Sequence, residues 1–255
     1  MGAALSAAWQ ALGAELRRWA DAGREVDFWW RDDDATRADP ALARLLGLAE
    51  RARVPLALAV IPSGAEGGLF GAMGPMVSVI QHGADHRSRA TGGAKKSEFP
   101  EGAAPREALA RLSAARERLA GLAGARLLPV LAPPWNRIDR ALLPGLAGAG
   151  FRGLSQYGPR GAEWPAPGLR QVNTHVDIID WHGGRGFAGE DVVLRKAEAH
   201  LAARRNGQAD PAEPTGWLTH HARHDGASWD FLERLFEFTH GAQAVRWKAA
   251  GALFA

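Results

Sequence analysis

The chain has 255 residues, enough for one sizeable hydrophobic core, and its 46% apolar content argues against a disordered protein. The formal net charge is only +3, and the arginines are interleaved with acids, so nucleic acid is not an expected partner. The absence of cysteine excludes disulfides and thiolate chemistry.

The first expected element is a helix over about 3–22. Apolar residues recur there at helical spacing, namely Leu5, Trp9, Leu12, Leu16 and Trp19. The N-terminus lacks the pattern of a signal peptide, and no apolar run is long enough to cross a membrane. We therefore expect a cytoplasmic protein without a membrane partner.

Strands and helices alternate along the rest of the chain. Short apolar runs predict strands at 26–30, 56–61, 77–80, 127–131, 151–155, 172–177 and 217–219. Helical patterns lie at 40–53, 105–122, 140–147, 191–205 and 228–240. This alternation predicts an α/β fold with a parallel sheet, and about seven units suggest a closed or nearly closed barrel. No linker divides the sequence, so we expect one domain over 1–255.

Polar clusters follow nearly every expected strand. They lie at 32–34, 82–86, 136, 177–180 and 220–225. In a parallel barrel the C-terminal ends of the strands meet on one face, where active sites are built. The pattern predicts that these clusters converge.

The segment His82-Gly83-Ala84-Asp85-His86 places two imidazoles four residues apart. Catalytic zinc commonly takes two histidines and one carboxylate, which leaves a position for water. The alternative interpretation is a pair of surface or capping histidines in a turn that contains glycine.

Three consecutive carboxylates follow the first strand. Asp32, Asp33 and Asp34 would repel one another without a cation or arginine nearby. A helix N-cap accounts for one of them, and the helix dipole for a second. A metal ligand beside a general base explains adjacent carboxylates better.

Other histidines and tryptophans complete the candidate set. His220, His221 and His224 follow the last strand, and one of them is a plausible general acid because imidazole titrates near neutral pH. His200 and His240 are expected on helix surfaces. Three tryptophans at the predicted face would suit the apolar side of a sugar ring, namely Trp30, Trp135 and Trp181.

Five short segments in this order resemble the motifs of the polysaccharide deacetylases, which are metal-dependent carbohydrate esterases. The segments are 31–35, 82–86, 132–135, 177–181 and 218–220. The resemblance implies a distorted (β/α)₇ barrel and removal of an acetyl group from an N-acetylated sugar. It also implies a divalent ion, and the ligand types favour zinc.

The resemblance assigns roles residue by residue. It implies that the metal ligands are Asp34, His82 and His86, that Asp33 is the base, and that His220, with His221 as the alternate, is the acid. The expected substrate-binding residues are Trp135, Asn136, Asp177, Asp180 and Trp181.

Three departures from the motifs define the alternatives. Ala132 stands where the family has an arginine that orients the base, and Arg31 and Arg137 are candidates to replace it. Gly83 replaces a Ser or Thr, and Ala35 replaces a glycine. The alternatives to a sugar deacetylase are a metal-free barrel that binds carbohydrate without cutting it, and an amidohydrolase for a small non-sugar amide.

Overall fold

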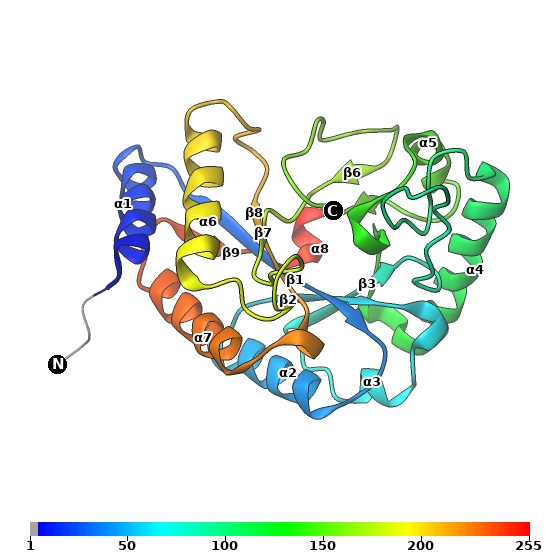
Figure 1. The fold of residues 1–255 in the computed structure, drawn as a ribbon, viewed down its shortest axis with the longest axis horizontal. Coiled ribbons are helices and arrows are strands. Elements are labelled where there is room, and N and C mark those ends of the chain that lie inside the picture. The colour runs from blue at the N-terminus through cyan, green and yellow to red at the C-terminus, as the bar shows by residue number, and fades with distance from the viewer. Residues whose placement is uncertain (1–4) are drawn as a thin grey trace.

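The computed structural model describes residues 5–255 and contains a single curled parallel sheet surrounded by helices (Figure 1). The sheet order is β6-β5-β4-β3-β2-β1-β8-β7, and β9 pairs with β1. The strands are β1 (Val26–Ala35), β2 (Leu56–Val60), β3 (Val77–His82), β4 (Leu127–Ala132), β5 (Gly153–Leu154), β6 (Arg170–Gln171), β7 (Val176–Asp177), β8 (Thr215–Thr219) and β9 (Val245–Trp247).

The two edge strands of this order belong to one continuous segment. Residues 170–177 pair with β5 at their start and with β8 at their end. Between these pairings, the N–H of Val172 donates to the carbonyl of Leu154, and the N–H of His175 donates to the carbonyl of Gly216. The segment therefore closes the sheet on itself, which confirms the distorted (β/α)₇ barrel. The expected strand 172–177 is broken because it changes partners midway.

Helices cover the outside of the barrel. They are α1 (Ala7–Asp21), α2 (Pro40–Ala52), α3 (Gly68–Gly71), α4 (Pro105–Ala123), α5 (Leu143–Leu146), α6 (Glu190–Arg205), α7 (Gly226–His240) and α8 (Ala250–Leu253). Short 3₁₀ turns are η1 (Pro62–Gly64), η2 (Gly124–Arg126), η3 (Pro134–Asn136), η4 (Arg140–Leu142) and η5 (His221–Arg223). Asp39 and Asp225 cap α2 and α7 by accepting the N–H groups of Leu42 and Ser228, each at 2.8 Å.

Two expected boundaries differ from the structure. The first helix begins at Ala7, and Leu5 is exposed; the expected positions 3 and 4 lie outside the described residues. Strand β1 runs on to Ala35, so the three aspartates belong to the strand instead of following it. Asp32 and Asp34 pair with groups from other segments, and Asp33 pairs with Arg31 of the same strand.

Alternation along β1 separates two cores. Trp29 packs with small residues of β2, including Ala57 and Ala59, in one buried cluster. Trp30 points the other way and packs against Phe236 of α7, with ring centroids 4.9 Å apart. Because side chains of a strand alternate between its two faces, Arg31 and Asp33 share the side of Trp29.

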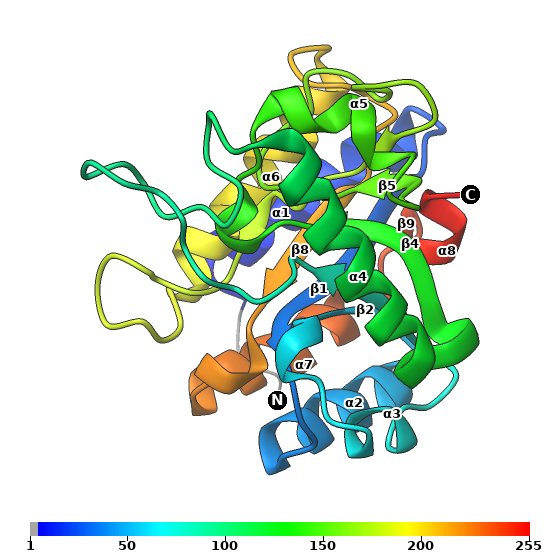
Figure 2. The same ribbon diagram turned by 90° about the vertical axis from the view of Figure 1, so that its right-hand side faces the viewer.

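The loops after β3 and after β7 project on the same side of the barrel (Figure 2). These loops, 83–104 and 178–189, carry several of the expected site residues. Within residues 5–255, no helix is both long and apolar enough to cross a membrane.

Closure of the barrel makes a first testable prediction. A Cβ at Gly216 would overlap Trp29 Nε1 and the backbone of Asn173 and Thr174. Gly216→Ala should therefore lower the free energy of unfolding by at least about 1–3 kcal/mol, because the closing segment has to move. Urea unfolding measures the change. Gly226→Ala is the matched control, since a Cβ there meets nothing within 4 Å; equal stability of the two variants would contradict this account.

Candidate active site

A bulge at the end of β1 brings two adjacent carboxylates to the same side. The pairing of β1 with β2 shifts register between Asp32 and Ala35. Asp34 adopts a left-handed backbone conformation with a φ of 73°. This breaks the alternation of the strand, so that both Asp33 and Asp34 line one cavity.

Asp34, His82 and His86 converge on one point. Oδ1 of Asp34 lies 3.2 Å from Nε2 of His82 and 3.2 Å from Nε2 of His86. One ligand atom from each residue lies within 4.8 Å of the others. Burial alone would raise the pKa of Asp34, but the two imidazoles outweigh it and hold that pKa far below its ordinary value.

The tautomer of His82 fits a cation at this point. Nδ1 of His82 lies 2.9 Å from the carbonyl oxygen of Ala132, an acceptor, so this nitrogen carries the proton. Burial would lower the pKa of His82, but Asp33 and Asp34 raise it above its ordinary value, so without a cation a proton on Nε2 joins the ring to Asp34. A metal ion would take the place of that proton between the imidazole and the carboxylate.

A buried carboxylate holds the turn between the two histidines. Glu98 is fully buried and accepts three successive backbone N–H groups, from Ala84 and Asp85 at Oε1 and from His86 at Oε2. Gly83 has a φ of +62°, and a Cβ there would overlap both Glu98 and Pro134. The glycine in place of Ser or Thr thus makes room for Glu98, which supplies the hydrogen bonds of the turn.

Arg31 orients Asp33. Its Nε lies 2.9 Å from Oδ1 of Asp33 and its Nη2 lies 3.0 Å from Oδ2, a bidentate pair that is fully buried. The same guanidinium donates to Oδ1 of Asn136 and to Oγ of Ser155. Arg137, the other candidate, is exposed and donates to the carbonyl of Lys96. Arg31 therefore provides the guanidinium contact to Asp33 that Ala132 cannot make.

Asp32 faces away from this cavity and binds His221. It accepts the backbone N–H of His221, lies 2.5 Å from its Nδ1, and accepts the hydroxyl of Thr219. Burial would raise the pKa of Asp32, but His221 lowers it below its ordinary value; the pKa of His221 rises in turn because Asp32 outweighs the effect of burial. His221 and His224 do not line the cavity, whereas His220 does.

The cavity has a volume of about 930 Å³ and gathers most of the expected site residues. Besides the metal-type triad, Asp33 and His220, it is lined by Trp135, Asn136, Asp177, Asp180 and Trp181. Trp181 lies edge-on to His220, with ring centroids 4.7 Å apart, and its Nε1 donates to Asp177. Trp30 is not at this face, because strand alternation turns it toward α7.

Backbone strain is concentrated at the same cavity. Six described non-glycine residues have positive φ, and all except Arg53 line it: Asp34, His86, Trp135, Asn136 and Arg185. Such conformations cost about 1–3 kcal/mol each and persist where surrounding contacts enforce them. Their distribution marks this cavity as the functional one.

No protein-family model matches the chain, and no curated protein matches it by sequence. Solved structures match it by shape. A putative polysaccharide deacetylase from Mycobacterium smegmatis matches with a TM-score of 0.62 at 16% identity, over 91% of this chain and 89% of that one. The chain has the polysaccharide deacetylase fold. The resemblance inferred from five short motifs is confirmed at that level.

Two further structures share this fold. A family 4 carbohydrate esterase from Streptomyces lividans, in complex with acetate, has a TM-score of 0.55 at 15% identity, over 87% of this chain and 90% of that one. A family 4 acetyl xylan esterase from Clostridium thermocellum, in complex with a cobalt ion, has a TM-score of 0.51 at 12% identity, over 89% and 90%.

A second group of metal-type residues lies at the other end of the polysaccharide deacetylase fold. His175, His200 and Glu213 are all buried, so the expected surface position of His200 is wrong. The N–H of Gly216 donates to Nδ1 of His175, which leaves the proton on Nε2, 3.3 Å from Glu213. A protonated nitrogen does not bind a metal, so this group is a structural contact between two imidazoles and a carboxylate.

Glu98 was not among the site residues expected from the sequence. Its hydrogen bonds to the turn lead to a testable prediction. Glu98→Ala should lower the free energy of unfolding by about 3 kcal/mol or more, because three backbone N–H groups lose their acceptor, one of them buried. Denaturant unfolding measures this, with Glu101→Ala as a control at an exposed acid nearby. If both variants unfold alike, the N–H groups do not depend on Glu98.

Burial lowers the pKa of His200 to about 2, with His175 and Arg204 adding to the effect. The folded protein thus keeps this ring neutral, while the unfolded chain takes up a proton below about pH 6.5. The free energy of unfolding should therefore fall as the pH falls. His200 should contribute about 1.4 kcal/mol of this loss per pH unit between pH 6 and 4. Unfolding free energies of His200→Asn should therefore vary less with pH than those of wild type. His182→Asn, at an exposed histidine, should keep the wild-type slope.

Proposed function

We propose that this protein is a metal-dependent hydrolase that removes the acetyl group from an N-acetylated sugar. The observation that carries the proposal is the convergence of Asp34, His82 and His86 beside Asp33 and His220 in one cavity. The structural neighbours include deacetylases and carbohydrate esterases, and this supports the proposal.

The proposed cofactor is zinc, held by Asp34, His82 and His86. Two imidazoles and one carboxylate are a common donor set of catalytic zinc and leave room for water and substrate. A bound ion would polarise the amide carbonyl and lower the pKa of water. The three protein ligands come from the ends of β1 and β3, which lie on either side of β2, and Glu98 fixes the turn that carries His86.

Asp33 is the proposed general base. Its carboxylate is held in one orientation by the bidentate contact with Arg31, and it is positioned to take the proton of the attacking water. The hydroxyl formed in this way adds to the amide carbon. Asn136 shares the guanidinium of Arg31 and thereby links the base to the wall of the cavity.

His220 is the proposed general acid, which protonates the nitrogen as the carbon–nitrogen bond breaks and acetate leaves. It lines the same cavity as the metal-type triad, and Trp181 packs against its ring. His221, the expected alternate, pairs with Asp32 and anchors the residues that follow β8. We therefore assign His221 a positioning role.

The aromatic side chains favour a sugar as the acetylated substrate. Trp135 and Trp181 both line the cavity, and Trp181 is 39% exposed, so it offers a free indole surface. Flat aromatic faces suit the C–H side of a sugar ring, while Asn136, Asp177 and Asp180 supply hydrogen-bonding groups.

Two variants separate the roles of base and ligand. Asp33→Asn should bind zinc as wild type does and lose at least about 100-fold in acetate release, because only proton removal is impaired. His86→Ala should lose both zinc and activity. Metal content after dialysis and acetate release from N-acetylglucosamine oligomers and from small linear and cyclic amides are the measurements.

The outcomes distinguish the alternatives. Full activity of Asp33→Asn would refute the assignment of the base. Failure of the wild type to retain zinc would favour a barrel that binds carbohydrate without metal. Acetate or amine release only from the small amides would favour an amidohydrolase with a non-sugar substrate.

A further inference from the structure

Basic side chains surround the mouth of the active-site cavity. They come from the loop after β3, from the turn after β4, from the loop after β7, from α6 and from η5. These residues are Lys96, Arg137, Arg185, Lys196 and Arg223. Within residues 5–255, no carboxylate oxygen lies within 4.0 Å of any of these five side chains, so none of them forms an ion pair. We call this group the basic rim.

The acids that line the cavity are fewer than its cations, and each acid side chain is held by a partner outside the basic rim. Asp33 binds Arg31, and Asp34 faces the two histidines. Asp180 accepts the backbone N–H groups of His182 and Gly183, at 3.1 and 3.0 Å. Asp177 accepts the N–H of Ile179 and the indole N–H of Trp181. With a divalent ion on Asp34, the mouth of the cavity carries an excess of positive charge.

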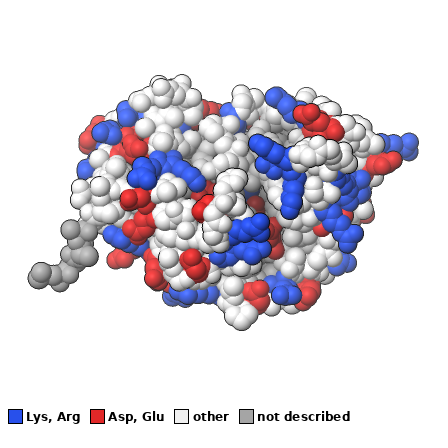
Figure 3. Space-filling view, in the orientation of Figure 1, with Lys and Arg blue, Asp and Glu red and all other residues white. Residues whose placement is uncertain are grey.

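The cations of the rim come from five separate segments that line one cavity. Lys and Arg side chains gather around a hollow near the middle of the face shown in Figure 3. Two of them are held by backbone carbonyls: Lys196 donates to Asp177, and Arg137 donates to Lys96. Lys196 is half-buried, whereas the other four are exposed. The charge is thus built on several independent segments around one opening.

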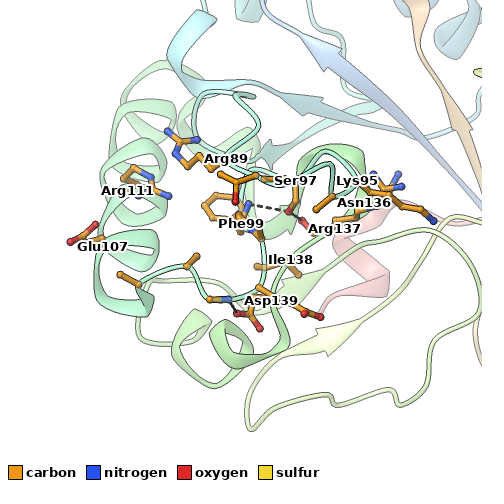
Figure 4. A pocket seen from close by; sticks show the side chains of 18 of the residues that line it. Arg89, Lys95, Ser97, Phe99, Glu107, Arg111, Asn136, Arg137, Ile138 and Asp139 are labelled. Carbon is orange, nitrogen blue, oxygen red and sulfur yellow. Dashed lines mark hydrogen bonds between the residues drawn. The ribbon is translucent and has the colours of Figure 1, made fainter.

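A neighbouring cavity of about 730 Å³ provides a comparison (Figure 4). It shares Asn136 and Arg137 with the active site. Its remaining cations, which are Arg89, Lys95 and Arg111, are accompanied by the acids Glu101, Glu107 and Asp139. Arg89 is also paired with Asp85, at 2.6 Å. The excess of positive charge is therefore a property of the active-site mouth and not of the whole face.

We propose that the substrate is an N-acetylated amino sugar that carries an anionic group, a carboxylate or a phosphate. This inference rests on the proposed deacetylase function and narrows its substrate class. A cleft lined by one sign of charge concentrates its field and attracts the opposite charge. The aromatic walls then contact the sugar ring, while the basic rim contacts the anion.

Binding of matched ligands tests this inference without turnover. Zinc-loaded Asp33→Asn is titrated with N-acetylglucosamine, with its 6-phosphate and with N-acetylmuramic acid, and tryptophan fluorescence follows binding. At low salt we expect the anionic ligands to bind about tenfold more tightly than the neutral one. In 1 M NaCl this preference should largely vanish, because the Debye length falls to about 3 Å. The two anionic ligands distinguish phosphate from carboxylate.

Rim variants localise the preference. Arg185→Gln and Arg223→Gln should each reduce the ratio of anionic to neutral affinity by about two- to fivefold, as expected for exposed charges. Arg152→Gln is the matched control, since Arg152 is exposed just before β5, at the opposite end of the strands. It removes the same charge and should leave the ratio unchanged.

The results separate this inference from the proposed function. Equal affinity for neutral and anionic ligands at low salt would overturn the inference, and so would a preference that Arg185→Gln and Arg223→Gln leave intact. Acetate release by the wild type from a neutral sugar would still support the deacetylase. Conversely, a salt-sensitive preference without acetate release from any of the three ligands would refute the proposed function and leave the anion specificity standing.

Discussion

Strand β1 distributes three adjacent carboxylates among three environments, and the architecture of the site depends on this distribution. Alternation turns Asp32 outward to His221 and Asp33 inward to Arg31. The bulge and the left-handed backbone at Asp34 then turn a second carboxylate inward, toward the histidines of β3 and its loop. Without the bulge, Asp34 would share the outer face with Asp32, and no ligand set would form.

Burying this much charge requires partners, because removing an unpaired ion from water costs several kcal/mol. Each buried charge near the site has one. Arg31 satisfies Asp33 and reaches Asn136 and Ser155, so a single guanidinium ties β1 to the ends of β4 and β5. Glu98 satisfies three N–H groups of the turn that carries His86. The pairs that make these charges tolerable also fix the orientation of the proposed base and of the proposed ligands.

The substitutions relative to the family motifs compensate one another in space. Ala132 lacks the guanidinium expected at that position, and Arg31 of β1 provides one inside the barrel. Gly83 lacks a hydroxyl, and Glu98 occupies the space that its side chain would take. Both replacing groups come from residues far along the chain from the position that was substituted. A comparison of short motifs therefore detects only the side chains that are missing.

The sequence by itself determined the seven barrel strands, the main helices and the meeting of polar clusters at the C-terminal strand ends, because period and apolar content are local properties. All the site residues that it predicted, except His221, line the cavity. Only the tertiary structure decided between Arg31 and Arg137 and between His220 and His221, and only it revealed Glu98 and the burial of His200. These choices depend on which face of a strand a side chain occupies and on what packs opposite. A one-residue bulge moves a side chain to the other face of its strand. The groups that pack opposite it come from chain segments far apart in the sequence.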